Sequence, residues 1–364
     1  MTSREVLTAI LKNKECPERM GVHEWFWQDT QHEWERQGLP AGVNIFDHFE
    51  LDVREIQGSY FRTGGFPVDD RIVEEDGETV IKINGWGAKH REWKDKPGAP
   101  GYISFDLVSE DVWKKKYRDN LLGLDLRRFP DWDNLKRSYR ELKASERFCV
   151  YHQMLLIEIM RRAMGDIVFL ESMVLAPGWI RDFCEVITRA ILIHWDHMIR
   201  EVGKPDGLWT YDDMGYTQAP FISPAFYRDF LLPYHKRITA FAHDHGLPIV
   251  LHSCGKIRPL LPGIVEAGFD ALHSMEAKAG QHVVEFAEAV RARGGRMAFV
   301  GNLDIRAFES NDPAILEAEI VPKLKAVREN RIPYVFFSDH SIPKTVNLQT
   351  YEYALDLFRK YGRY

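Results

Sequence analysis

The stretch Ile249-Val-Leu-His-Ser-Cys-Gly255 decides how the rest of the chain is interpreted. Its apolar start has the composition of a buried strand, and Gly246 and Gly255 mark its two ends. His252 and Cys254 stand two residues apart where this strand ends, so on extended backbone their side chains point to the same side. An imidazole and a thiol presented together suit an ion such as zinc, and a buried cysteine beside a hydrogen-bonded histidine is the plainer alternative.

The stretch belongs to a regular alternation of short apolar segments and longer helical ones, which begins near residue 147. The predicted strands are 147–152, 207–211, 248–251, 271–275, 297–300 and 334–337. The first predicted helix ends near residue 164. The later ones cover 182–202, 224–245, 257–267, 282–293, 313–329 and 347–361. This alternation predicts parallel strands joined by helical crossovers. No Gly-x-Gly-x-x-Gly follows the first strand, and the length of 364 residues favours an α/β fold of the (β/α)8 TIM-barrel type.

The chain before residue 147 has a different pattern. Within 59–106, Asp76-Gly77 stands between two β-type segments, which is a hairpin signal. Residues 107–146 are charged and helical in pattern. We interpret residues 1–364 as a single TIM-barrel domain with an N-terminal helical and β-hairpin extension, in which 59–106 is a hairpin-rich insertion and 107–146 a helical cover.

Composition and charge exclude several classes of protein. The net charge of −6 argues against nucleic acid as the main partner. No run of about 18 apolar residues occurs, so we expect no membrane span, and the polar start of the chain lacks the apolar centre of a signal peptide. The 4 cysteines are scattered, which favours a reducing compartment and a cytoplasmic protein.

Polar residues follow the predicted strands at their carboxyl ends, where the chemistry of such barrels is located. In chain order they are Asp212 and Asp213, His252 and Cys254, Glu276, Asn302 and Asp304, and Asp339 and His340. Each has a plainer explanation: Asp213 or Asp304 as a helix cap, and Asn302 in a turn. Asp339 is equally suited to orient His340 or to act in the chemistry. Their occurrence at successive strand ends favours one shared functional site.

The residue types at these strand ends predict a zinc site. His252, Cys254 and His340 could supply three ligands, with Glu276 as a fourth or exchangeable one. Three firm protein ligands and an open position are what zinc catalysis requires. Because zinc lowers the pKa of a bound thiol or water, such a site generates a nucleophile at neutral pH.

The remaining polar strand-end residues complete the predicted site by orienting ligands or moving protons. The predicted catalytic residues are Asp213, Glu276, Asp339 and His340. The predicted cofactor-binding residues are Asp212 and Asn302. The other histidines, His273 among them, we interpret as structural or surface residues.

Several motifs along the chain carry a family resemblance. They are Ser3-Arg-Glu-Val-Leu near the start, Asp212-Asp-Met-Gly, Ile222-Ser-Pro-Ala-Phe-Tyr, His252-Ser-Cys-Gly and Ser338-Asp-His-Ser-Ile-Pro. Together they resemble the uroporphyrinogen decarboxylase superfamily, and within it the corrinoid- and zinc-dependent methyltransferase-like branch. The resemblance covers nearly the whole chain and implies the (β/α)8 barrel independently of the strand pattern.

The motifs also distinguish branches of this superfamily. In the branch that moves methyl groups between corrinoid proteins and thiols, a His-x-Cys pair and a later cysteine bind zinc. His252 and Cys254 match that pair, and His340 replaces the later cysteine. The decarboxylase itself carries an N-terminal arginine-rich motif that residues 22–36 do not match, and it lacks the His-x-Cys pair. It does carry a histidine at the place of His340.

The resemblance implies a zinc-dependent methyltransferase. The methyl group would move between a small methoxylated or methylated compound, a thiol or a folate and a corrinoid (cobalamin), as in O-demethylation. The expected partners are the small methyl donor or acceptor and the protein that carries the corrinoid, and a homodimer is one possible assembly. Two alternatives stay open: a uroporphyrinogen decarboxylase-like lyase acting on another organic acid, and a corrinoid- or ligand-binding protein without turnover.

Overall fold

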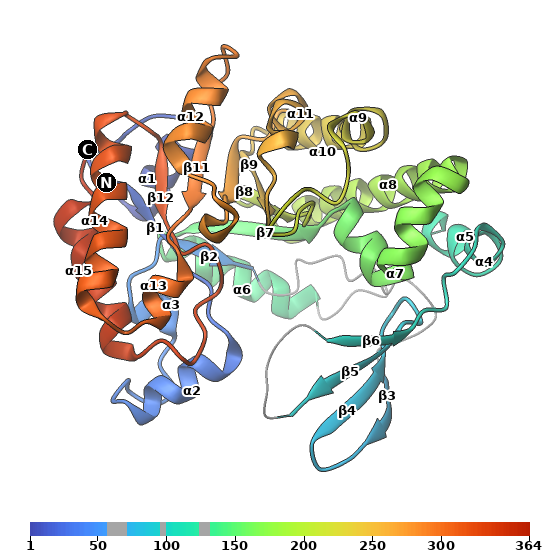
Figure 1. Cartoon of the computed structure of the whole chain (residues 1–364), viewed down its shortest axis with the longest axis horizontal. Helices are drawn as coiled ribbons and strands as arrows, with labels where there is room; N and C mark the ends of the chain where they lie inside the picture. The colour runs from blue at the N-terminus through green and yellow to red at the C-terminus, as the bar shows by residue number, and fades with distance from the viewer. Residues whose placement is uncertain (57–70, 95–99, 124–131) are drawn as a thin grey trace. The chain divides into compact units, whose positions relative to one another are not determined.

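The computed structural model describes residues 1–56, 71–94, 100–123 and 132–364 (Figure 1). The chain forms two compact units. The first comprises Met1–Ile56, Ser138–His152 and Pro205–Tyr364, and the second Gln57–Arg137 and Gln153–Lys204. The parts of the predicted insertion and cover at 59–70, 95–99 and 124–131 lie outside the described residues.

A parallel sheet of 8 strands, in the order β1-β12-β11-β10-β9-β8-β7-β2, is the centre of the first unit (Figure 1). Its strands are β1 (Gly21–Val22), β2 (Val53–Glu55), β7 (Phe148–Met154), β8 (Gly207–Tyr211), β9 (Ile249–Ser253), β10 (Ala271–Ser274), β11 (Ala298–Gly301) and β12 (Tyr334–Phe336). The first and last strands of this order approach each other, because the Asp52 N–H donates to the Val22 carbonyl at 2.8 Å. The sheet is therefore a nearly closed TIM barrel, and the predicted fold class is confirmed.

Helices connect the strands of the first unit. They are α1 (Ser3–Leu7), α2 (Gln28–Arg36), α3 (Ile45–His48), α9 (Pro224–Phe226), α10 (Leu232–Asp244), α11 (Leu261–Ala267), α12 (Val283–Arg291), α13 (Ile305–Glu309), α14 (Pro313–Glu329) and α15 (Leu348–Tyr361). The caps explain where they begin: the Asp312 side chain accepts from the Ala314 N–H, and Pro313 occupies the first turn of α14. The periodic pattern explains how they pack, since α15 buries Leu348, Tyr351 and Phe358.

The barrel interior is filled at the amino ends of the strands. Side chains from the strands and from the N-terminal helical segment share one buried cluster, which includes Leu7, Ile10, Val53, Phe148, Trp209, Val250, Ala298 and Val335. Packing of this kind leaves no open channel through a barrel. Within the barrel interior, room for polar side chains is therefore left at the carboxyl ends of the strands, which we call the barrel mouth.

The sequence does not predict β1 and β2. They have 2 and 3 residues and lie outside the regular alternation of apolar runs and helices that predicts the equally short β12. Their place is fixed by tertiary contacts instead: the buried Asp52 carboxylate accepts from the Val22 N–H at 2.8 Å and pairs with Arg19 at 2.7 Å. The barrel consequently begins within the region that the sequence assigns to the N-terminal extension.

The second unit contains an antiparallel sheet of β3 (Arg71–Glu75), β4 (Thr79–Ile83), β5 (Lys89–Trp93) and β6 (Gly101–Ser104). The hairpin predicted at Asp76-Gly77 joins β3 to β4, and the Asp76 carboxylate accepts from the Glu78 and Thr79 N–H groups at 2.8 and 2.6 Å. The Asp-Gly signal thus identified a local turn without any tertiary information.

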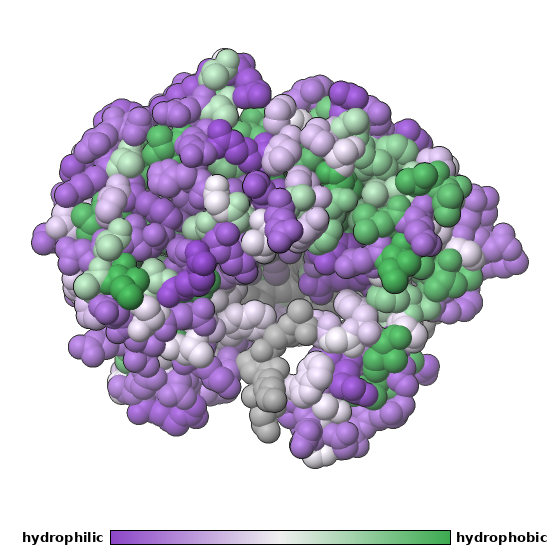
Figure 2. Space-filling view, viewed as in Figure 1, coloured by the Kyte–Doolittle hydropathy of each residue, from purple (hydrophilic) through white to green (hydrophobic). Residues whose placement is uncertain are grey.

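Helices of this unit include α4 (Glu110–Val112), α5 (Arg118–Leu122), α7 (Leu156–Leu175) and α8 (Pro177–Glu201), while α6 (Trp132–Ala144) runs across the boundary between the units. None of the described helices is by itself long and apolar enough to cross a membrane; α7 and α8 meet that criterion only as a pair bent by 115°. Exposed apolar side chains occur on α7, among them Ile167, Val174 and Leu175, and Figure 2 shows hydrophobic side chains at the surface of these helices.

Candidate metal centre

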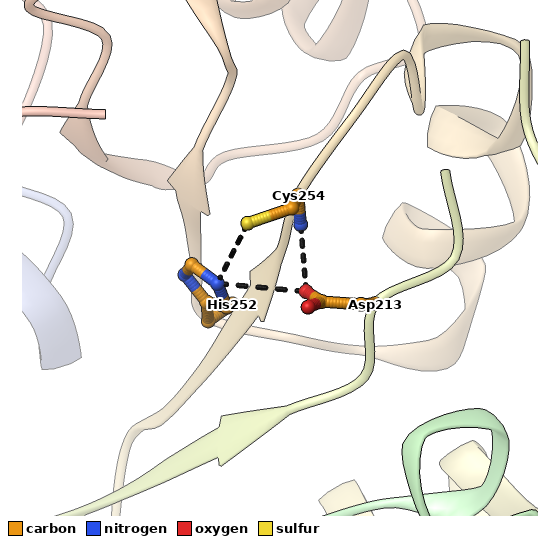
Figure 3. Close-up of side chains that lie close together, drawn as sticks. All are labelled: Asp213, His252 and Cys254. Atoms are coloured by element: carbon orange, nitrogen blue, oxygen red, sulfur yellow. Dashed lines mark hydrogen bonds and ion pairs between the residues drawn. The ribbon is translucent and has the colours of Figure 1, made fainter. Parts of the chain in front are cut away.

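The parallel register of the sheet brings the polar strand ends to one level at the barrel mouth. Tyr211 of β8 is in register with His252 of β9, and His252 is in register with His273 of β10. Asp213 and Cys254 lie just beyond the ends of their strands, close to His252 (Figure 3). The order of strands in the barrel therefore brings together polar strand-end residues that are far apart in the chain, as the sequence predicts.

Four side chains named as zinc ligands from the sequence lie close together. The Cys254 Sγ is 3.2 Å from His252 Nε2 and 4.0 Å from His340 Nε2. The His340 Nε2 is in turn 4.0 Å from an oxygen of Glu276, Oε2. Zinc bond lengths at tetrahedral angles place neighbouring donor atoms about 3.3 to 3.6 Å apart. The separations of Cys254 Sγ from the two histidines are near these values, so a zinc ion fits the contact of Cys254 with either histidine. His252 does not fall into one donor group with His340 and Glu276.

The donor atoms form two overlapping groups that share Cys254, and within each group they lie within 4.8 Å of one another. One group is Cys254, Glu276 and His340, and the other is Asp213, His252 and Cys254. The Asp213 Oδ1 is 3.5 Å from His252 Nε2 and accepts the Cys254 N–H at 2.8 Å (Figure 3). Asp213 was predicted as a catalytic residue, and its position also makes it a donor candidate.

The orientation of His252 is set by a second histidine that the sequence analysis treats as structural. The two Nδ1 atoms of His252 and His273 are 2.9 Å apart, so one donates and the other accepts. This contact directs the His252 Nε2 toward the Cys254 sulfur, as residues behind a metal ligand commonly do. Burial lowers the pKa of His252 and, more strongly, of His273. His252 is consequently held neutral, which is the form that binds a metal.

His340 is oriented by the residue that precedes it. The Asp339 Oδ1 is 3.2 Å from His340 Nδ1, and the buried Asp339 carboxylate also accepts the Ala277 and Ile305 N–H groups at 2.8 and 3.1 Å. Burial lowers the pKa of His340, but the hydrogen bond and charge of Asp339, with the charge of Glu276, outweigh burial and raise it. Asp339 therefore positions the ring and leaves its Nε2 facing the cluster.

The Glu276 carboxylate is held by a glycine loop. Its Oε2 accepts the Gly255 N–H at 2.7 Å, and its Oε1 is 3.1 Å from Lys278 Nζ. Gly255 has φ +76°, and a Cβ at this position would lie 2.2 Å from the backbone carbon of Gly215. Only glycine fits there, so the loop after β9 can present its amide to Glu276.

Aromatic residues flank the cluster on the side of Trp25. The Trp25 ring is 5.5 Å from the His252 ring, and its Nε1 donates to Glu55 Oε1 at 2.8 Å. The Tyr211 hydroxyl donates to the same Glu55 oxygen at 3.3 Å. The sequence did not predict Trp25, Glu55 or Tyr211 as mouth residues. The high Trp content of residues 22–36 was a signal, but it could not be separated from core packing.

Asp212 lies away from the donor groups. It is fully buried, and its Oδ2 is 3.0 Å from His235 Nε2, whose Nδ1 is 2.9 Å from the Tyr227 hydroxyl. Successive side chains point to opposite faces on extended backbone, so Asp212 and its neighbour Asp213 face different ways. The cofactor-binding role predicted for Asp212 has no counterpart among the described donor groups.

The side chains of Asn302 and Asp304 form hydrogen bonds with backbone groups. The Asn302 side chain donates to the Gln281 carbonyl at 3.0 Å and accepts from the Val283 N–H at 2.9 Å, which fixes the loop before α12. Asp304 caps α13 and accepts from the Arg306 N–H at 3.0 Å. The turn and cap alternatives stated from the sequence describe what these two side chains do.

A TIM barrel with a thiol, imidazole and carboxylate donor set at its mouth defines a class of barrel protein with a candidate metal centre. The model of the uroporphyrinogen decarboxylase (URO-D) family matches residues 161–361, and the chain belongs to this family. The motif-based family resemblance is thereby confirmed.

Comparison with solved structures agrees on the fold. A methyltransferase from Methanosarcina mazei is similar with a TM-score of 0.67 and 14% identity, over 99% of each chain. The endo-1,4-β-mannanase from Rhizomucor miehei gives a TM-score of 0.47 and 8% identity over 94% of each chain, too low to carry an argument. Among curated proteins, no match to the sequence is found.

Proposed function

We propose that this protein is a zinc-dependent methyltransferase. It would move a methyl group between a small methylated or methoxylated compound, a thiol or a folate and a corrinoid carried by a partner protein. The observation that supports the metal most directly is the position of Cys254 Sγ, 3.2 Å from His252 Nε2 and 4.0 Å from His340 Nε2. The methyltransferase of similar fold and the His-x-Cys motif support the reaction class.

The two histidine ligands that we propose are each oriented by a neighbouring side chain. His252 is held neutral by burial and directed by His273, and His340 is directed by Asp339. A bound zinc ion lowers the pKa of a coordinated thiol or water and keeps it nucleophilic at neutral pH. We assign Glu276 as the donor that exchanges with the substrate, because its Oε2 keeps the Gly255 amide as a second partner.

Asp213 is the residue we assign to proton handling. Its Oδ1 accepts the Cys254 N–H and is 3.5 Å from His252 Nε2, and its side chain is partly exposed at the mouth. A carboxylate placed between solvent and the donor atoms can take or return a proton. The neighbouring Trp25 and Tyr211 rings offer an apolar contact surface to a methyl donor or to the flat face of a corrin.

The test is methyl transfer to cob(I)alamin by the purified chain. In this reaction cob(I)alamin attacks the methyl carbon, the donor's bond to carbon breaks, and methylcobalamin and the demethylated thiolate or alkoxide are released. Cys254→Ala is expected to lose transfer, whereas Cys184→Ala, which removes a buried thiol of α8, is the matched control and is expected to retain it. Equal rates in wild type and Cys254→Ala would contradict the proposal.

A decarboxylase-like lyase is the second candidate, and the family match is the observation that favours it. It predicts release of carbon dioxide from an organic acid without transfer of a methyl group. Corrinoid binding without any turnover would instead identify the third alternative, a corrinoid- or ligand-binding protein. Carbon dioxide release, methyl transfer and corrinoid binding, measured on one preparation, separate the three.

A further inference from the structure

We propose that the first unit carries a second ligand site, at the amino ends of β11 and β12, which binds an organic anion. The ligand class is a phosphate or carboxylate group on an apolar body. The site is a hollow of about 220 Å³, at the end of these strands opposite the barrel mouth. Its lining includes Lys14, Arg291, Arg296, Arg331, Val290 and Phe299.

Three of the four cationic side chains of this hollow form no ion pair among the described residues. Lys14 is paired with Asp270. In the part of the chain that the structure describes, no carboxylate oxygen lies within 4.0 Å of the guanidinium groups of Arg291, Arg296 or Arg331. Three guanidinium groups without such an ion pair around one hollow create a positive potential that attracts anions. Arginine is also the side chain best suited to bind phosphate or carboxylate through paired donors.

Hydrogen bonds to neutral backbone carbonyls hold two of these arginines in place and leave their positive charges unpaired with a carboxylate. The Arg291 Nη2 donates to the carbonyls of Asn330 and Arg331 at 2.7 and 2.9 Å. The Arg296 Nη2 donates to the Lys14 carbonyl at 3.0 Å. Each guanidinium has five N–H donors, so most donors of both groups stay available to a ligand.

Cys16 lies close to the same arginines. It lines an adjoining hollow of about 530 Å³, which shares Lys14, Arg296 and Arg331 with the first. Burial raises the pKa of the Cys16 thiol, while Arg331, Arg291 and Arg296 each act to lower it. Because Arg296 and Arg331 line both hollows, a single anionic group placed there could contact both guanidinium groups.

The other wall of the hollow is apolar. Val290, Met297, Phe299, Ile332 and Pro333 line it, and they come from α12, from β11 and from the segment that leads into β12. A bare inorganic ion would leave this wall without a partner. A ligand with a charged head and an apolar body contacts both walls, as ligands of concave protein sites commonly do.

The test is calorimetric titration of the whole chain with phenyl phosphate, which combines both features. Saturable binding is expected, and phenol or inorganic phosphate alone is expected to bind at least about tenfold more weakly. Arg296→Gln with Arg331→Gln should weaken phenyl phosphate binding about tenfold or more. Arg293→Gln is the matched control. Arg293 lies on the same loop as Arg296, between α12 and β11, but outside this hollow, and its Nη1 donates to the Ala289 carbonyl at 2.8 Å.

The double variant Arg296→Lys with Arg331→Lys distinguishes loss of positive charge from a folding defect, because it replaces the same two side chains and keeps both charges. It should bind more tightly than the Gln variant and lose affinity as salt is added. Absence of saturable binding to wild type, or equal affinity of wild type and the Gln variant, would overturn the proposal. Loss of binding in Arg293→Gln to the same degree would also overturn it.

Discussion

The replacement of His273 by Phe tests how the His252 ligand is oriented. His273 is 1% exposed and is packed against Trp25 and Phe337, with ring centroids 5.1 and 4.3 Å apart, so a phenyl ring preserves most of the packing. It removes the contact with His252 Nδ1, 2.9 Å away, and leaves that nitrogen unsatisfied in a buried place. Such a loss costs about 1 to 3 kcal/mol. Loss of a residue behind a metal ligand separately weakens metal affinity about 10- to 100-fold, or about 1.4 to 2.7 kcal/mol.

The assay is competition for zinc between the metal-free protein and a chromophoric chelator. His273→Phe should bind zinc about 10- to 100-fold more weakly than wild type. His273→Gln is the matched control, because its amide can still form a hydrogen bond to His252 and should recover part of the affinity. Unchanged zinc affinity in His273→Phe, with an unchanged unfolding transition, would refute the claim that His273 orients His252.

Three further substitutions test the support of the site and the core. Gly255→Ala should move the loop and lower both stability and zinc content, since φ is +76° and the new Cβ would lie 2.2 Å from Gly215; urea unfolding and metal analysis measure this. Tyr227→Phe should cost about 1 to 3 kcal/mol in urea unfolding, because the buried ring nitrogen of His235, 2.9 Å from the hydroxyl, loses its partner. Burial raises the pKa of Glu24 from 4.5 to about 8, against three hydrogen bonds that lower it. Protonated Glu24 therefore makes its full contribution to the unfolding free energy below pH 4.5, and this contribution is lost as the pH rises through about 8. Because glutamine does not ionise, Glu24→Gln should show a smaller fall of the unfolding free energy over this pH range.

The strands that the sequence predicted are those in the regular alternation of apolar segments and helices after residue 147. β8 and β9 have 5 residues each, and their polar ends could be located because parallel strands present them at one edge. β1 and β2 were missed because their position depends on Asp52, whose partner Val22 is remote in sequence. Local pattern carries no information on a contact of this kind.

The candidate site likewise has features that the sequence predicts and features that depend on tertiary contacts. Cys254 and His340 each follow a predicted strand, so the sequence predicts that they meet at the barrel mouth, and their donor atoms lie 4.0 Å apart. The role of His273 was not predicted, because it depends on the register that places β10 beside β9. The opposite directions of Asp212 and Asp213 also needed the structure, since the sequence shows two adjacent carboxylates without showing where the strand ends.

Metal analysis of the purified chain, prepared without chelator, tests the central claim most directly. Wild type should contain about one zinc ion per chain, and Cys254→Ser should lose it, because the thiolate is the strongest ligand of the set. A wild-type protein without zinc, or a Cys254→Ser variant that retains it in full, would contradict the account.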